Sequence, residues 1–211
     1  MLNLLKAIPK TNFVSTSLQR NFSNAVLDCI KSRRSCRSFD PNKEVKRSDI
    51  EEILDIAKHS PSANHSQPWK VKITTNAPML RRMGKEYFEV FKKDKQFRGF
   101  VQMAKKLPVS EPIFYDAPMA MFIYADLKRG KGIFTNLDVG IFVGSILHGL
   151  ESKGLGGVAL GVLKFQQDIL EKEIRTEENE ELLIGIGVGY AKEDFQPNKK
   201  NLKTDDVQWL D

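Results

Sequence analysis

The strongest constraint on the fold is a continuous apolar run over residues 117–125, with the sequence APMAMFIYA. A short run without polar alternation is typical of a buried strand. Residues 134–153 form the most apolar helix pattern of the chain, and they include Gly140, Gly144 and Gly149. Because glycine lowers helix stability, its use here indicates close approach by another helix or a cofactor. We expect a centrally buried helix that also suits a subunit interface, within one α/β domain that 211 residues are enough to build.

Periodicity and turn residues predict the other elements around this core. In chain order they are a helix capped by Ser23, a helix that starts from a capping box at 48–51, a strand at 69–73, a helix opened by Pro78 that continues through a basic segment at 92–106, a strand at 156–163, a helix at 166–175 and a strand at 182–190.

A glycine-rich motif lies in the strand predicted at 182–190. Residues 185–189 read GIGVG, which imitates a dinucleotide-binding loop. Such a loop joins a strand to a helix in a βαβ unit, whereas these residues lie inside an apolar alternation that Pro197 follows. We therefore predict a core strand that contains glycine.

Two short motifs near the start of the chain carry chemical information. The first, at residues 33–39, reads RRSCRSF and gathers three guanidiniums and two hydroxyls into seven residues. Arginine presents a rigid fork of donors that suits phosphate and planar, electron-rich acceptors. The second, at residues 60–69, reads SPSANHSQPW and is a turn-forming run that leads into a strand. Together they predict a site for a phosphorylated, planar organic cofactor; a solvated basic helix end is the alternative for the first motif.

The net charge of +6 does not indicate nucleic-acid binding. Residues 1–27 hold three cations and no acid, so only +3 of the +6 belongs to the remaining chain. No long basic run with interleaved aromatic residues remains there. No stretch approaches the roughly 18 consecutive apolar residues that a membrane-spanning helix needs. We expect neither a nucleic-acid nor a membrane partner.

The first 22 residues have the composition of a targeting segment. They are acid-free, rich in Ser, Thr and Asn, and mix Leu and Ile with spaced cations, as mitochondrial transit peptides do. Arg20 stands two residues before a possible matrix-protease cut between Phe22 and Ser23. We predict a transit peptide at 1–22 and a mitochondrial or related organellar location, otherwise cytoplasmic; a disordered tail or surface arm is the alternative.

The sequence gives no support for a metal site or a catalytic side-chain set. Cys29 and Cys36 are too few for a structural zinc site or an iron–sulfur cluster, so we expect buried free thiols. The three histidines lack metal-ligand spacing, and His148 is expected to be a buried, hydrogen-bonded side chain. No residue set argues for nucleophilic catalysis.

From residue 24 onward the chain resembles the FMN-dependent nitroreductase family. RRSCRSF is similar to the family motif R-R-S-x-R-x-F, and SPSANHSQPW is similar to [AS]-P-S-x-x-N-x-Q-P-W. The segments IFYDAPMAMFIYAD and LDVGIFVGSILHGLESKGLGG extend the similarity. The resemblance implies an α+β three-layer sandwich, with a central, mainly antiparallel mixed sheet flanked by helices. It also implies a domain-swapped homodimer with two FMN sites at its interface, built from residues 23–211 including a C-terminal arm.

The resemblance assigns roles to the first motif. Arg33 and Ser35 would bind the FMN phosphate, and Arg34 would contact the flavin or its ribityl side. Arg37 would lie at the pyrimidine end of the ring, where reduction places negative charge. A fixed cation at that position stabilises the reduced flavin and tunes it as a hydride acceptor.

The second motif would contribute to the site of the partner subunit. Pro61, Ser62 and Ala63 would reach the partner's flavin. The family's Asn falls at His65, whereas Asn64 stands one place earlier, so either of these side chains could contact FMN.

Two further segments complete the implied site. The backbone at Ala159, Leu160 and Gly161 would approach the flavin ring and offer an N–H to N5. In the C-terminal arm, Lys200 would bind the phosphate, with Lys199 as its neighbour.

The implied activity is ping-pong transfer of hydride from NADH or NADPH, through FMN, to a nitroaromatic, a quinone or a similar electron-poor acceptor. No dedicated catalytic side chain is needed, because the cofactor carries the chemistry. One alternative is a specific reaction such as dehalogenation, dehydrogenation or flavin breakdown, for which only the segment 92–112 could supply a substrate lid. Another is a flavoprotein that only binds FMN or takes electrons from a separate ferredoxin. A ferredoxin could dock on the cations Lys92, Lys93, Lys95, Arg98, Lys105 and Lys106.

Overall fold

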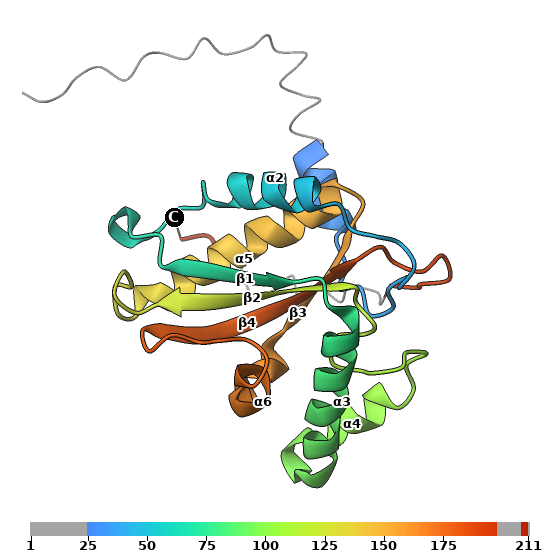
Figure 1. Cartoon of the computed structure of the whole chain (residues 1–211). Coiled ribbons are helices and arrows are strands. Elements are labelled where there is room, and N and C mark those ends of the chain that lie inside the picture. Colours follow the sequence, from blue (N-terminus) through green and yellow to red (C-terminus); the bar gives the residue numbers. More distant parts are fainter. Residues whose placement is uncertain (1–24, 198–207, 211) are drawn as a thin grey trace, which may run out of the picture. The chain divides into compact units, whose positions relative to one another are not determined.

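The computed structural model describes residues 25–197 and 208–210 (Figure 1). Its contacts divide the chain into two units, Met1–Ser32 and Arg33–Asp211. In the first unit residues 25–32 are helical, as predicted, and Val26 and Leu27 on this helix are exposed. Its predicted cap at Ser23 and the predicted transit peptide at 1–22 lie outside the described residues. The remaining fold belongs to the second unit.

A four-stranded antiparallel sheet forms the centre of the second unit. The strands are β1 (Trp69–Thr74), β2 (Met119–Asp126), β3 (Gly156–Leu160) and β4 (Glu180–Gly189), in the spatial order β1-β2-β4-β3. All eight residues of β2 are buried, which confirms the strand predicted from its apolar run. Residues 185–189 lie within β4, so the glycine motif is part of a core strand, as expected. Ser35 adds a parallel bridge to Gly157 on β3, which makes the pairing mixed.

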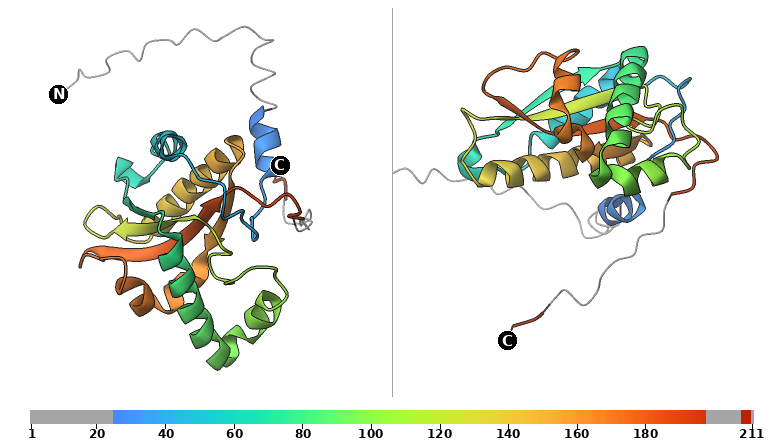
Figure 2. Two further views of the ribbon diagram at one scale, coloured as in Figure 1. Left: turned by 45° about the vertical axis from the view of Figure 1, so that its right-hand side comes forward. Right: turned by 90° about the horizontal axis from the view of Figure 1, so that it is seen from below.

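Helices cover both faces of the sheet, so the predicted three-layer α+β arrangement is confirmed (Figures 1 and 2). One face carries α2 (Arg47–Ala57) and α5 (Phe134–Ser152), and the other carries α3 (Ala77–Lys93), α4 (Arg98–Ala104) and α6 (Gln167–Glu171). Alternate side chains of β2 pack against the helices on the two faces of the sheet. Met121 and Ile123 pack in the cluster of α2 and α5, whereas Phe122 and Tyr124 pack in the cluster of α3 and α6.

The glycines of α5 separate into two groups. A Cβ atom on Gly149 would lie 2.8 Å from Cγ2 of Ile53, so this glycine allows α2 to pack closely on α5 and confirms the expected helix contact. At Gly140 and Gly144 no described atom lies within 4 Å of a Cβ position. These two glycines face open space instead of a helix of the same chain.

Several predicted boundaries are wrong. The capping box at 48–51 does not form, because α2 begins at Arg47 with Lys46 as N-cap and without a side-chain cap bond. The basic segment is not one continuous helix. Asp94 adopts an extended conformation, and its carboxylate accepts a hydrogen bond from the Gln96 N–H, which ends α3 and opens the 3-10 turn η2 (Lys95–Phe97) before α4.

The C-terminal half also shows shorter elements than predicted. β3 ends at Leu160, because residues 161–165 wind into the 3-10 turn η3 (Gly161–Phe165). The helix expected at 166–175 is reduced to α6, which stops at Glu171.

The helix α3 starts as predicted. Pro78 lies in its first turn, and the Asn76 side chain accepts a hydrogen bond from the Met79 N–H at 3.0 Å.

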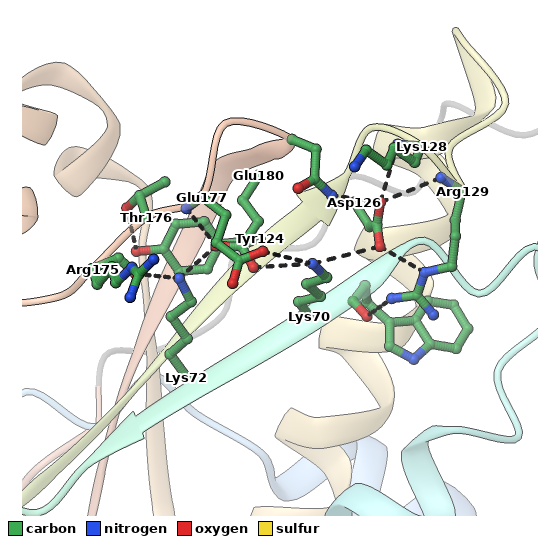
Figure 3. A network of polar contacts seen from close by, with 12 residues as sticks. Lys70, Lys72, Tyr124, Asp126, Lys128, Arg129, Arg175, Thr176, Glu177 and Glu180 are labelled. Atoms are coloured by element: carbon green, nitrogen blue, oxygen red, sulfur yellow. Dashed lines mark hydrogen bonds and ion pairs between the residues drawn. The ribbon is translucent and has the colours of Figure 1, made fainter.

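A network of charged groups joins β1, β2 and β4 at one end of the sheet (Figure 3). Lys70 Nζ lies 3.2 Å from Glu180 Oε1 and 3.7 Å from Asp126 Oδ2. Arg129 donates from Nε to Asp126 at 2.9 Å and from Nη2 to the Trp69 carbonyl at 2.9 Å. Burial acts to raise the pKa of Asp126, but hydrogen bonds from Arg129 and other donors outweigh it and lower that pKa to about 2.

We expect Asp126→Asn to lower the free energy of unfolding by about 1–2 kcal/mol near pH 6. An acid whose pKa is lower in the folded state stabilises the fold above its unfolded pKa, and this contribution is lost as the pH falls toward the folded value of about 2. The difference between the two proteins should therefore shrink between about pH 4 and pH 2. Urea titrations over this range test it, with Asp55→Asn as the control, since Asp55 forms an exposed pair with Lys58. A difference that is constant over this range would contradict the prediction.

Candidate functional site

The arginine segment, residues 33–39, is fixed in an extended conformation beside β3 and the end of β4. The Cys36 N–H donates to the Gly157 carbonyl at 3.1 Å, and Ser35 forms the parallel bridge to the same residue. The Lys192 N–H donates to the Ser38 carbonyl at 3.1 Å. Phe39 forms an antiparallel bridge to Ala191. The sequence motif is therefore a short edge segment with fixed side-chain directions.

A small cavity of about 160 Å³ opens beside this segment. Its walls are Ser35, Arg37 and Ser38 on one side, with Leu107, Pro108, Asp194, Phe195 and Gln196 around them. Arg33 and Arg34 are half-buried nearby in the sequence, and Arg34 Nη1 donates to the Arg33 carbonyl at 3.0 Å.

The donors of this region suit a phosphorylated flavin. Guanidiniums and hydroxyls offer many hydrogen-bond donors to phosphate and to the acceptor-rich pyrimidine edge of the ring. The cavity is smaller than the 300–1,000 Å³ typical of ligand pockets, so it can hold only part of such a molecule. FMN therefore fits the chemistry of the segment, but its site requires further walls.

The second motif forms a tight loop with left-handed residues before β1. Asn64, His65 and Gln67 have φ values of 52°, 54° and 45°, and residues 63–65 form the turn η1 (Ala63–His65). The Ser62 hydroxyl accepts from the Gln67 N–H at 3.0 Å, which closes the loop. The His65 ring lies 3.1 Å from the Gln67 side-chain amide, so its direction is set by a neighbour in the motif.

Two residues of α5 hold this loop, and the sequence interpretation missed both. The Ala63 N–H donates to both carboxylate oxygens of Asp138 at 3.1 Å, and Asp138 is buried. The Ser60 and Ser145 hydroxyls lie 2.8 Å apart. The signal for Asp138 was available, because a carboxylate among the apolar residues of this helix needs a hydrogen-bond partner when it is buried.

The two motifs lie at opposite ends of the sheet within one chain (Figure 1). Trp69, which follows the second motif's loop, pairs with Ala125 of β2. Ser35 bridges to Gly157, and through β4 this position is level with Met119 at the other end of β2. Six strand positions of about 3.3 Å separate the two levels by about 20 Å. One chain cannot bring both motifs to the same small ligand ring.

Of the other predicted site residues, Ala159, Leu160 and Gly161 lie in the described part of the chain, and the two lysines of the C-terminal arm do not. Ala159 and Gly161 are exposed and Leu160 is buried, at the end of the edge strand β3. In the described part of the chain, no strand pairs with the outer edge of β3 beyond Gly157. Lys199 and Lys200 lie outside the described residues.

Cys36 is a buried free thiol, as expected, and burial raises its pKa, which keeps it protonated. Cys29 is half-buried, so the prediction that its thiol is buried is wrong. Residues 25–197 and 208–210 contain no group of three or more potential metal ligands. In the same ranges no helix combines the length and apolarity needed to cross a bilayer.

Comparison with known proteins identifies the family. The Nitroreductase family model matches residues 30–190. The chain belongs to the nitroreductase family. An iodotyrosine dehalogenase 1 homolog of Caenorhabditis elegans is 27% identical over 78% of this chain, which spans 54% of that protein's length. The 4-nitrobenzoate reductase of Pseudomonas putida is 23% identical over 85% of this chain and 91% of its own.

A solved structure confirms the nitroreductase fold. The FMN-dependent nitroreductase NfnB from Mycobacterium smegmatis, in complex with NADPH, superposes with a TM-score of 0.69 at 21% identity, covering 90% of this chain and 99% of that one. The expected family and its α+β fold are therefore confirmed. Nitroreductase and dehalogenase names both occur among the relatives, so the acceptor is not fixed by membership of the family.

Proposed function

We propose that this protein is an FMN-dependent oxidoreductase that passes hydride from NADH or NADPH to a nitroaromatic, a quinone or a similar electron-poor acceptor. The observation that carries the proposal is the arginine segment, fixed at the edge of the sheet with its hydroxyl and guanidinium donors around a small cavity. When bound, FMN would accept hydride at N5 and pass it on.

The chain's own residues would bind and orient this cofactor. Arg33 and Ser35 would hold the phosphate, with Lys199 and Lys200, and Arg34 would contact the flavin or ribityl side. Arg37 would face the pyrimidine end, where its fixed charge favours the negative charge that reduction places there. The exposed backbone at Ala159 and Gly161 leaves room for close approach of the ring.

We also propose that the active form is a homodimer. Pro61, Ser62 and Ala63, together with Asn64 or His65, would complete the partner's site, because one chain holds the two motifs about 20 Å apart. The exposed side of α5 supports this assembly. Apolar residues on and just before that helix are left uncovered, namely Ile133, Phe134, Leu137 and Ile141, and they accompany the open positions of Gly140 and Gly144.

The direct test measures the flavin absorbance of the purified protein. The purified protein should hold FMN, and NADH or NADPH should bleach its flavin absorbance in an anaerobic stopped-flow experiment. A protein that contains no flavin and takes up no added FMN would overturn the proposal.

Arg37→Ala should slow flavin reduction about tenfold or more while the protein stays folded. The loss of one fixed cation removes stabilisation of charge that develops on the reacting ring. Arg47→Ala is the matched control, because Arg47 lies on the exposed start of α2 and forms an exposed ion pair with Glu51. An unchanged reduction rate in Arg37→Ala would contradict the role given to this residue.

The positive charge of the α3–α4 hairpin supports a ferredoxin as the alternative electron donor. Residues 81–106 carry nine cations and three acids, and Lys93, Lys95, Arg98, Lys105 and Lys106 are exposed. Leu107, next to this surface, also lines the arginine cavity. An acidic ferredoxin could dock there. Bleaching by a reduced ferredoxin, but not by NADH or NADPH, would favour this donor.

A specific reaction such as reductive dehalogenation is the alternative activity within the same fold. Turnover assays with halogenated and nitro-substituted aromatics distinguish it from reduction of nitro groups.

We also propose targeting to the mitochondrion or a related organelle through residues 1–22. A fluorescent fusion with and without this segment tests this location.

A further inference from the structure

Another cavity, of about 340 Å³, lies on the α3–α4 hairpin (Figure 1), and we call it the hairpin cavity. Its volume falls within the range of about 300–1,000 Å³ that is typical of small-molecule sites. Apolar side chains and exposed ammonium groups line it, among them Phe88, Leu107 and Val109 and the lysines Lys85, Lys92 and Lys105. A molecule with both an apolar and an anionic part would match this lining.

Both helices of the hairpin contribute these cations. Lys85, Phe88 and Lys92 stand at positions i, i+3 and i+7 of α3, so their side chains lie on one face of this helix. Lys105 is the C-cap residue of α4. The cavity therefore gathers positive charge from two segments that the turn η2 joins.

The charge of the hairpin cavity is only partly balanced. Lys92 Nζ lies 2.5 Å from Glu89 Oε1 and 5.6 Å from the centre of the Phe88 ring. Among the ion pairs of residues 25–197 and 208–210, none includes Lys85 or Lys105. Three lysines and one glutamate line the cavity, so two positive charges exceed the acids of its lining. A phosphate monoester carries about two negative charges at neutral pH and would balance them.

A short segment separates the hairpin cavity from the cavity beside the arginine segment. Leu107 lines both cavities, Pro108 lines the arginine cavity, and Val109 lines the hairpin cavity. A ligand that passes over Leu107 would therefore reach the arginine cavity with one end and the lysines with the other. Such a ligand must be elongated, with its phosphate monoester at the end that is remote from the flavin.

We propose that the hairpin cavity binds the adenosine 2′-phosphate end of NADPH and thereby makes the enzyme prefer NADPH to NADH. The two donors differ only in this phosphate, so cations that contact it discriminate directly between them. Lys85, Lys92 and Lys105 would hold the phosphate, and the half-buried Phe88 would contact the adenine. The inference rests on the proposed function, because hydride transfer to a flavin is what would bring the nicotinamide to the arginine cavity.

The concave shape of this site favours a small molecule over a protein partner. An acidic ferredoxin would contact a broad surface, and it would use exposed lysines both at the cavity and beside it. Lys93 and Lys95 lie on the same hairpin but do not line the cavity. Comparison of two pairs of lysines, one at the cavity and one beside it, therefore separates the two kinds of ligand.

The test is isothermal titration calorimetry on the purified full-length protein. The probe is 2′,5′-ADP, which carries the 2′-phosphate, and the reference is 5′-AMP, which lacks it. We expect the wild type to bind 2′,5′-ADP at least about tenfold more tightly than 5′-AMP. The double variant Lys85→Gln/Lys105→Gln should lose about tenfold in affinity for 2′,5′-ADP and keep its affinity for 5′-AMP. Lys93→Gln/Lys95→Gln is the matched control and should change either affinity by less than about twofold.

Kinetics of the flavin-containing enzyme give a second readout. In Lys85→Gln/Lys105→Gln the KM for NADPH should rise about tenfold, whereas kcat and the KM for NADH should not change. Equal binding of the two probes by the wild type, or an equal effect of the two double variants on 2′,5′-ADP, would overturn the proposal. If neither NADH nor NADPH reduces the flavin, the proposed function fails instead, and the calorimetry still decides whether the cavity binds the phosphate.

Discussion

Gly84→Ala should lower the free energy of unfolding by about 3 kcal/mol. Gly84 lies inside α3, where alanine normally stabilises a helix relative to glycine by about 1 kcal/mol. Here a Cβ atom would lie 2.0 Å from Glu111 Oε2 and 2.7 Å from its Cδ. The Glu111 carboxylate cannot move aside without leaving its buried N–H donors unpaired, so the steric cost should exceed the gain in helix propensity.

Gly99→Ala is the control for this substitution. Gly99 lies in α4, and no described atom lies within 4 Å of its Cβ position. There the alanine should be neutral or stabilise by up to about 1 kcal/mol. Chemical denaturation of the two variants compares the same change in two environments, and a Gly84→Ala protein as stable as Gly99→Ala would show that Glu111 is not held in place.

Stability should also fall by about 2–3 kcal/mol between pH 4 and pH 8 through Glu111 alone. Burial raises the pKa of this carboxyl to about 7 and outweighs the backbone hydrogen bonds that favour its charged form. An acid with a raised folded pKa contributes stability that is complete below its unfolded pKa and is lost as the pH rises through the folded value. The sign is therefore opposite to that of Asp126.

Glu111→Gln isolates this contribution, because its side chain is uncharged throughout the range. The nearest ionisable neighbours are Asp116, which raises the pKa of Glu111 by repulsion, and Tyr115. Wild type and variant should differ in their pH dependence by about 2–3 kcal/mol in urea titrations from pH 4 to pH 8. Parallel curves would mean that folding does not raise the pKa of Glu111.

The regular parts of this fold are predictable from local patterns. The apolar run that became β2 and the strongly apolar pattern that became α5 depend on burial alone, which the residues themselves indicate. The predicted boundaries were wrong where a local turn redirected the backbone. Asp94 interrupts the basic helix by capping the next turn, and the turn at 161–165 shortens β3.

The sequence indicated which side chains carry the chemistry of the site, but not which residues hold them in place. The cationic donors Arg33 and Arg37 were visible in the sequence, and the structure fixes their segment at the sheet edge. One support of the segment was not visible, because the Tyr115 carbonyl, which accepts from the Phe39 N–H, lies in a distant left-handed loop that local propensity disfavours. The need of Asp138 for a partner was visible, but the partner itself was not, since it is a backbone N–H in a distant loop.

The strand order has a consequence for synthesis on the ribosome. β2 can pair with β1 soon after residue 126 is translated, but its other edge pairs with β4, which begins only at Glu180. During translation of the intervening segment, the nascent chain therefore carries its most apolar strand with one edge unpaired. Such an edge can pair with other chains, so this stretch of translation is the period in which a chaperone would protect the growing chain most.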